Sequence, residues 1–345
     1  MTIYRDGDWR LGLVRFAKGM GAIALMESCA IAFPQNWTWA QNITLDGTLG
    51  QPGTLTGPAY IIPQALGQTV GNNLFHSFGK FNLNTGEEAY FQSAANIRNI
   101  LSRVTGGSPS SINGLILTDS ANVNLFLINP SGIQFGPNAR LDVGGTTRGS
   151  FVATTVDALV WSNGSQFSAT NPGGANSLLT MVGDPSGFLA SQRTPQPIAL
   201  SRSILKVYEG QSLLLLGGDV TLDQSILYVD YFKGGRIELG GVAGAGTVGL
   251  SVNGNDLVLG FPNDVTRADV SLANGSLMDV SAEDGGNIAI HARNLNISGG
   301  SALRGGIGSG LGFPGSQAGD IIFNATGTVR VDNSSVESDS DGVEG

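Results

Sequence analysis

Short apolar segments separated by glycine, asparagine and serine recur along the chain from residue 42 onward, and this pattern most constrains the fold. Within a segment, apolar and polar residues alternate, which is typical of strands and not of helices. The phrases Gly285–Leu303 and Ala318–Val336 share one order of glycine, polar residue and isoleucine, at an offset of 33 residues. Related pieces are Gly217–Leu227, Gly234–Val242 and Ala268–Ser281. The recurrence predicts a solenoid of stacked coils.

Two-residue alternation with glycine or asparagine at the corners is what a parallel β-helix requires. Each coil turns its Ile, Val or Leu side chains inward and stacks on the next coil about 4.8 Å away, so that neighbouring coils bury each other's apolar faces. Glycine supplies a positive φ at the corners, and asparagine side chains can hydrogen-bond along a stack of corners. An antiparallel sandwich would also alternate but would not favour one recurring phrase. We therefore expect an all-β chain with a parallel β-helix.

A leader precedes this pattern. Four basic residues come first: Arg5, Arg10, Arg15 and Lys18. The apolar run Gly19–Phe33 follows them, and it is shorter than the roughly 20 residues that span a bilayer. This order predicts a signal peptide over residues 1–40, with cleavage after Ala40 or, alternatively, after Ala32. A buried helix is the other interpretation, and a lipoprotein acceptor at Cys29 is disfavoured by the acidic residue two positions earlier.

Charge and cysteine content exclude several classes of protein. The chain carries 18 basic and 27 acidic residues, a formal net charge of −9, with no basic cluster for a phosphate backbone, so no nucleic-acid partner is expected. A single cysteine allows neither an intramolecular disulfide nor a cysteine-based metal site. The nonapeptide pattern of calcium-binding rolls and the phosphate-binding glycine loop are both absent from the sequence. We expect no metal and no cofactor.

Catalytic side chains are sparse. His76 and His291 are the two histidines, and neither stands near a serine and aspartate arrangement in the sequence, which favours structural roles. Some β-helical enzymes cleave polysaccharides with carboxylates on one sheet face, and Asp219, Asp223 and Asp230 are the candidates for such a cluster. Solvated corner positions explain these aspartates equally well. The sequence therefore predicts a protein that is not an enzyme.

Four phrases in the N-terminal half carry a family resemblance: Asn73–Leu83, Asn96–Gly107, Asn124–Gly145 and Gly149–Thr155. Together they resemble the secretion domain of two-partner secretion exoproteins, also called the filamentous haemagglutinin N-terminal or haemagglutination activity domain, with wording closest to its cyanobacterial branch. The resemblance implies a right-handed, three-sheet parallel β-helix with an N-terminal cap and extra-helical hairpins. It assigns residues 41–290 to this domain and residues 291–345 to further coils of a truncated chain.

In the resembling family, a motif of the Asn-Pro-Asn-Gly-Ile type belongs to the region recognised during secretion. Asn129, Pro130, Ser131, Gly132 and Ile133 match this motif, with serine in place of the second asparagine. Because proline fixes φ and glycine permits unusual turn conformations, the same residues predict a tight corner between two strands.

A second candidate secretion region comprises Asn96, Ile97, Asn99 and Ile100. The family's earlier Asn-Pro element would fall just before it, where this chain has Ser93 and Ala94. The apolar residues from Ile97 to Val104 also follow helical spacing, whereas the resemblance favours β structure, so helix and strand both remain open here.

The resemblance implies an adhesin-like exoprotein that is secreted or held at the cell surface after crossing the periplasm and outer membrane. Its partner would be a dedicated outer-membrane β-barrel transporter of the Omp85 type. The alternative function is a β-helical surface module that binds a cell-surface glycan or protein receptor. A polysaccharide-degrading enzyme is the weakest alternative.

Overall fold

The computed structural model describes residues 42–119, 122–144, 149–174, 177–191, 194–230, 232–253 and 256–339. The chain divides into two units, residues 1–38 and 39–345, and all described residues belong to the second. The predicted signal peptide therefore lies outside the described residues, as does the insertion at residues 145–148. Among the described residues, no helix is long and apolar enough to cross a membrane.

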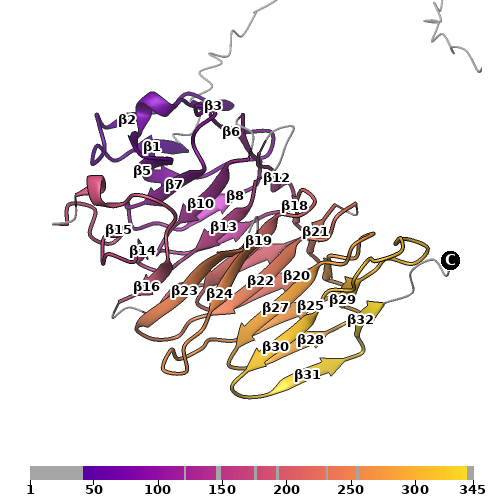
Figure 1. Cartoon of the computed structure of the whole chain (residues 1–345). Helices are drawn as coiled ribbons and strands as arrows, with labels where there is room; N and C mark the ends of the chain where they lie inside the picture. The colour runs from indigo at the N-terminus through magenta and orange to yellow at the C-terminus, as the bar shows by residue number, and fades with distance from the viewer. Residues whose placement is uncertain are drawn as a thin grey trace, which may run out of the picture. The chain divides into compact units, whose positions relative to one another are not determined.

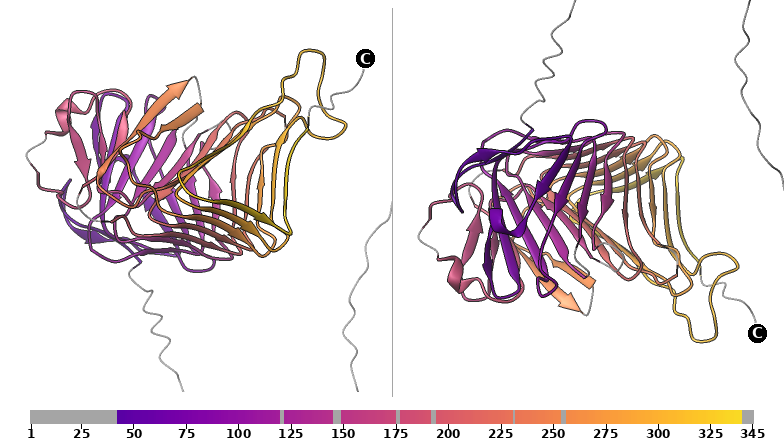
Figure 2. Two further views of the ribbon diagram at one scale, coloured as in Figure 1. Left: turned by 90° about the horizontal axis from the view of Figure 1, so that it is seen from below. Right: turned by 90° about the horizontal axis from the view of Figure 1, so that it is seen from above.

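The alternating segments form a parallel β-helix, as the sequence predicts (Figure 1). One side of each coil contributes a strand to a long sheet. Its parallel strands, in spatial order, are β5 (Asn73–Phe81), β7 (Asn99–Val104), β10 (Asn124–Ile128), β13 (Phe151–Thr154), β19 (Ser212–Gly217), β22 (Arg236–Gly241), β27 (Asn287–Ala292) and β30 (Ile321–Ala325). Figure 2 shows these strands as successive layers along the solenoid.

The other two sides of the coils complete the three-sided solenoid. The second sheet contains β8 (Ser110–Ile112), β11 (Ile133–Phe135), β17 (Ile198–Ser201), β20 (Val220–Asp223), β25 (Val270–Ala273), β28 (Leu295–Ser298) and β31 (Val329–Asp332). The third side has two sheets. The first contains β3 (Ala59–Ile62), β6 (Glu88–Phe91), β9 (Leu115–Thr118) and β12 (Arg140–Asp142), and the second contains β18 (Ile204–Val207), β21 (Ile226–Val229), β26 (Leu277–Asp279), β29 (Ala302–Gly306) and β32 (Ser335–Asp339).

Two further parts cover the solenoid. The N-terminal cap consists of β1 (Ile43–Leu45), β2 (Gly53–Thr54), the 3₁₀ helix η1 (Gln64–Leu66) and β4 (Gln68–Val70), and both β1 and β4 pair antiparallel with β5. An outer antiparallel sheet contains β14 (Ala158–Val160), β15 (Gln166–Ser168), β16 (Gly187–Ala190), β23 (Gly246–Asn253) and β24 (Asp256–Gly260), with η2 (Leu178–Thr180) between β15 and β16. The expected cap and extra-helical hairpins are therefore confirmed.

The predicted repeat is also confirmed. Ile288 pairs with Ile321, and Leu303 pairs with Val336, both at the offset of 33 residues read from the sequence. Serines at the corner before the third side form a ladder, in which the backbone N–H of each donates to the hydroxyl of the next. Its members are Ser203, Ser225, Ser276, Ser301 and Ser334. The ladder satisfies buried backbone donors that a solenoid corner would otherwise leave without partners.

The segment left open between helix and strand is strand β7, so the helical spacing is misleading there. All six of its residues are buried, because the long sheet has an apolar layer on both faces. Ile100 points into the solenoid, whereas Leu101 packs beneath the outer sheet. A strand buried on both faces reads as a continuous apolar run, and two-residue alternation is then invisible.

Candidate functional site

The Asn-Pro-Ser-Gly sequence forms the corner between β10 and β11. The backbone N–H of Gly132 donates to the carbonyl of Asn129 at 3.0 Å, and Gly132 has a φ of 113°, a value that favours glycine. Asn129 Oδ1 accepts the backbone N–H of Ser131 at 2.9 Å. Proline at the second position and asparagine at the first suit such a turn. The predicted tight corner is therefore confirmed.

Asn129 also ties this corner to the preceding coil. Its Nδ2 donates to the Ser108 carbonyl at 3.0 Å and to Ser110 Oγ at 2.9 Å, and the side chain is wholly buried. Ile133 follows as a fully buried residue of the core. The motif thus fixes how two coils stack. Its contact with a secretion partner stays a prediction.

We expect Asn129→Ala to lower the free energy of unfolding by about 2 kcal/mol, because the Ser108 carbonyl and the Ser131 N–H lose buried partners. Ser131→Ala is the matched control, since the half-exposed Ser131 contacts Asn129 through its backbone. Urea unfolding of both variants measures the difference. Equal midpoints would show that the Asn129 side chain does not hold the corner.

The second predicted region is divided by the fold. Asn99 is buried within an asparagine ladder at the amino ends of three long-sheet strands. Its Nδ2 donates to Asn73 Oδ1 at 2.9 Å and to Asp184 Oδ1 at 2.8 Å, and its Oδ1 accepts from Asn124 Nδ2 at 3.1 Å. Asn96, by contrast, is exposed in a turn. Stacked asparagines were expected from the sequence, but their register with the strand starts was not.

The two predicted regions do not come together. Because β7 and β10 pair in parallel, with Asn99 opposite Asn124 and Arg103 opposite Ile128, Asn99 lies at the amino end of these strands. Asn129 lies just beyond their carboxyl ends. Ile97 and Ile100 are core residues, so side-chain recognition of either would require an unfolded chain.

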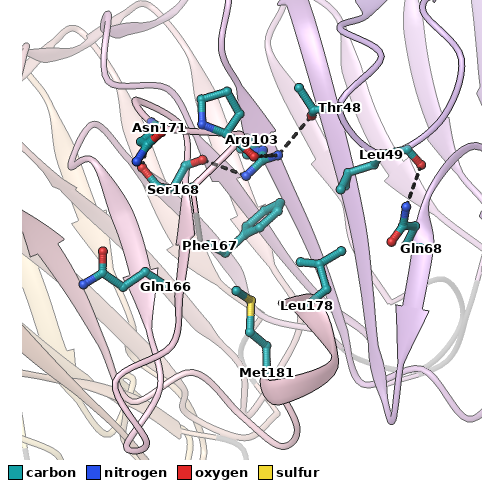
Figure 3. Close-up of a pocket in the computed structure, with 12 residues that line it drawn as sticks. Thr48, Leu49, Gln68, Arg103, Gln166, Phe167, Ser168, Asn171, Leu178 and Met181 are labelled. Atoms are coloured by element: carbon teal, nitrogen blue, oxygen red, sulfur yellow. Dashed lines mark hydrogen bonds between the residues drawn. The ribbon is translucent and has the colours of Figure 1, made fainter. Parts of the chain in front are cut away.

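A buried polar cluster between the cap and the outer sheet was missed by sequence reasoning. A cavity of about 280 Å³ lies there, and Arg103 reaches across it from β7 (Figure 3). Arg103 Nη2 donates to Thr48 Oγ1 at 3.0 Å, and Nη1 donates to the Ser168 carbonyl at 2.7 Å. The guanidinium stands 4.4 Å from the centroid of the Phe167 ring. A single arginine in an apolar-rich phrase gave no signal of these distant partners.

The electrostatics of the cluster follow from burial and hydrogen bonding. Burial lowers the pKa of Arg103 to about 10, and the charge of Asp46 opposes this shift. Burial would raise the pKa of Asp46, but hydrogen bonds from Ser77, Thr48 and Thr105 outweigh it and lower that pKa overall. Both groups are therefore charged at neutral pH. The cluster is an internal anchor with both signs of charge.

The candidate aspartates each have their own partner. Asp219 Oδ1 accepts the backbone N–H of Asp269, Asp223 Oδ1 accepts Asn274 Nδ2, and Asp230 pairs with Lys206 at 3.1 Å. These are contacts of the kind that hold neighbouring coils in register. Within the described part of the chain, no three histidine, cysteine, aspartate or glutamate side chains are placed to hold a metal ion.

The two histidines lie in different buried layers. His76 is fully buried in the solenoid core beside Phe78 and Phe91. His291 lies on the outward face of the long sheet, stacked on Phe261 at 4.6 Å between ring centroids. Burial lowers the pKa of each to about 4, and for His291 the nearby Arg267 and Arg236 charges add to this. Both rings are therefore neutral at pH 7.

Comparison with known proteins assigns the family. A family model described as the TPS secretion domain matches residues 41–290, well over half of the chain. The solved HMW1 secretion domain from Haemophilus influenzae is similar in fold, with a TM-score of 0.57 at 18% identity over 83% of this chain and 63% of that one. The chain thus spans less than two thirds of that structure. The filamentous hemagglutinin secretion domain matches with a TM-score of 0.45 at 13% identity, over 80% of this chain and 91% of that one.

No curated protein sequence matches the chain. The family model therefore carries the assignment, and the likeness to the HMW1 domain shows a shared fold. The phrases that resemble the family are also the ones that form the first consecutive strands of the long sheet. The chain belongs to the TPS secretion domain family, that of two-partner-secreted exoproteins.

Proposed function

We propose that residues 1–40 direct the chain to the periplasm and that the N-terminal coils then engage a dedicated outer-membrane transporter of the Omp85 type. One observation carries this proposal: the four family-like phrases are stacked as neighbouring strands β5, β7, β10 and β13 of one sheet. A transporter would thus meet one continuous piece of structure that leaves the cell first.

Coil-by-coil folding outside the cell supplies a physical reason for forward movement. Each new coil buries its apolar residues against the previous one, at about 25 cal/mol for each Å² removed from water. The strands pair in parallel over the whole length of the long sheet, so each exported coil adds a row of hydrogen bonds. A stacked coil must unfold before the chain can slide back.

The proposed end product is an adhesin-like protein, secreted or at the cell surface, that binds a glycan or protein receptor. In support, the solvent-facing side chains Thr221, Ser271 and Asn296 lie in register on neighbouring strands of the second sheet. Hydroxyl and amide groups of this kind can hydrogen-bond to polar ligands. The proposal assigns no catalytic step to the chain.

Co-expression with a candidate transporter tests the export role. We expect the chain in the medium or on the cell surface when the transporter is present, and in the periplasm of the strain that lacks it. The cell-bound share of the exported chain reports the adhesive role. Equal release from both strains would contradict transporter-directed export, and complete release of the chain into the medium would contradict adhesion to the producing cell.

A further inference from the structure

Three separate parts of the chain meet on the side chain of Arg103. Nε donates to Ser77 Oγ on β5 at 2.8 Å, and Nη2 reaches Thr48 in the cap. Nη1 and Nη2 also donate to the carbonyls of Ser168 and Pro172, at 2.7 and 3.2 Å, in the first outer hairpin. The cap partner lies 55 residues before Arg103, and the Ser168 carbonyl lies 65 residues after it.

These contacts are built for strength. The Arg103 side chain is nearly inaccessible, with 3% of the residue exposed, and its donors point to fixed carbonyls and hydroxyls. Hydrogen bonds from a charged group are stronger than neutral ones, and a guanidinium fork holds several partners at once. Losing the partners on one side would leave a buried charge poorly solvated, which is costly. The cap and hairpin therefore share one energetic contact.

The hairpin also covers an apolar surface that would otherwise face water. Phe75, Leu101, Phe126 and Val152 point outward from neighbouring strands of the long sheet, and each is at most 1% exposed. They pack in one cluster with outer-sheet residues such as Phe167. The cover follows these four strands in the sequence. A chain that leaves its pore amino end first would therefore expose this face until the hairpin arrives.

We propose that Arg103 is a positioning residue that couples the N-terminal cap to the first outer hairpin, so that residues 42–54 and residues 157–172 close and open as one unit. Closure buries the apolar face of the first four coils. The order of closure during export rests on the proposed function, whereas the coupling itself rests on the contacts of Arg103 alone.

The sharpest test places the change in the cap and reads the effect in the hairpin. In the full chain, Thr48→Val removes the cap's hydroxyl partner of Arg103. We expect amide hydrogen exchange to become about fivefold faster in both segments, the effect of losing one hydrogen bond. Faster exchange in residues 42–54 with no change in residues 157–172 would overturn the coupling.

Arg103→Met tests the same contact more severely, with Arg140→Met as the matched control. Arg140 is exposed and donates to the nearby carbonyls of Pro137 and Ala139. We expect exchange in both segments to accelerate at least about a hundredfold for Arg103→Met, while strands β19 to β28 keep their protection, and the control stays unchanged. Acceleration in one segment alone, or throughout the solenoid, would contradict the coupling.

Arg103→Lys separates the fork geometry from the charge. Lysine keeps the charge but cannot hold the hydroxyl and the two carbonyls together, so we expect it to recover only part of the protection. Full recovery would overturn the role of the fork. All three measurements use purified full chain without a transporter, so they stand or fall separately from the export experiment.

Discussion

Replacing Asn99 by leucine is expected to lower the free energy of unfolding by about 3 to 5 kcal/mol. Leucine has nearly the same size, so the main change is the loss of hydrogen bonds. Asn73 and Asp184 each lose a donor, and Asn124 loses an acceptor, at the amino ends of the long-sheet strands. Buried or half-buried polar groups left without partners account for the expected cost. Denaturant unfolding monitored by circular dichroism measures it.

Asn96→Leu is the matched control for this prediction. It makes the same chemical change three residues earlier, in an exposed turn. We expect its unfolding midpoint to stay within about 0.5 kcal/mol of the unmodified chain. If the two leucine variants were equally stable, the asparagine ladder would not be the feature that holds the first coils in register.

Acidification is expected to destabilise the fold through its two buried histidines. In the folded chain the pKa values of His76 and His291 lie at about 4, below the ordinary value of 6.5 that the unfolded chain retains. The unfolded state therefore binds protons first as the pH falls. Stability is greatest above pH 6.5 and is lost between pH 6.5 and 4, by about 3 kcal/mol for each histidine near pH 4.

Single substitutions isolate each histidine. His76→Leu and His291→Gln should each remove about 3 kcal/mol of the stability difference between pH 7.5 and 4. Burial raises the pKa of Glu238 despite its pairing with Arg236, and this works in the opposite direction, because the folded chain then takes up a proton more readily. Urea midpoints at both pH values, compared among the unmodified chain and the two variants, give the measurement. Parallel pH profiles would contradict the histidine origin.

The turn at Asn129 shows how far local sequence reaches. Asparagine, proline and glycine each limit the backbone in their own way, and the corner is formed by bonds within four residues. Its position in the solenoid was also readable, since a strand precedes and follows it. The stacking contact to Ser110, in the coil before, depends on register between coils and could not be read locally.

Strand β7 shows the opposite case. Its helical spacing arises because Ile100 and Leu101 face two different apolar layers, inside and outside the long sheet. The outer layer is supplied by strands that follow much later in the sequence, such as β16 and β23, which pair with each other across two separate insertions. A local pattern cannot reveal a cover that comes from elsewhere in the chain.

The sequence by itself determined the solenoid: alternation, corner glycines and asparagines, and the 33-residue repeat are local properties that each coil repeats. Tertiary structure alone decided the second apolar core and the contacts of Arg103. The Thr48, Ser168 and Pro172 partners lie 55 to 69 residues from Arg103, and two of those contacts are backbone carbonyls, which every residue carries. Backbone groups leave no mark in a sequence, so only the folded path brings them to the arginine.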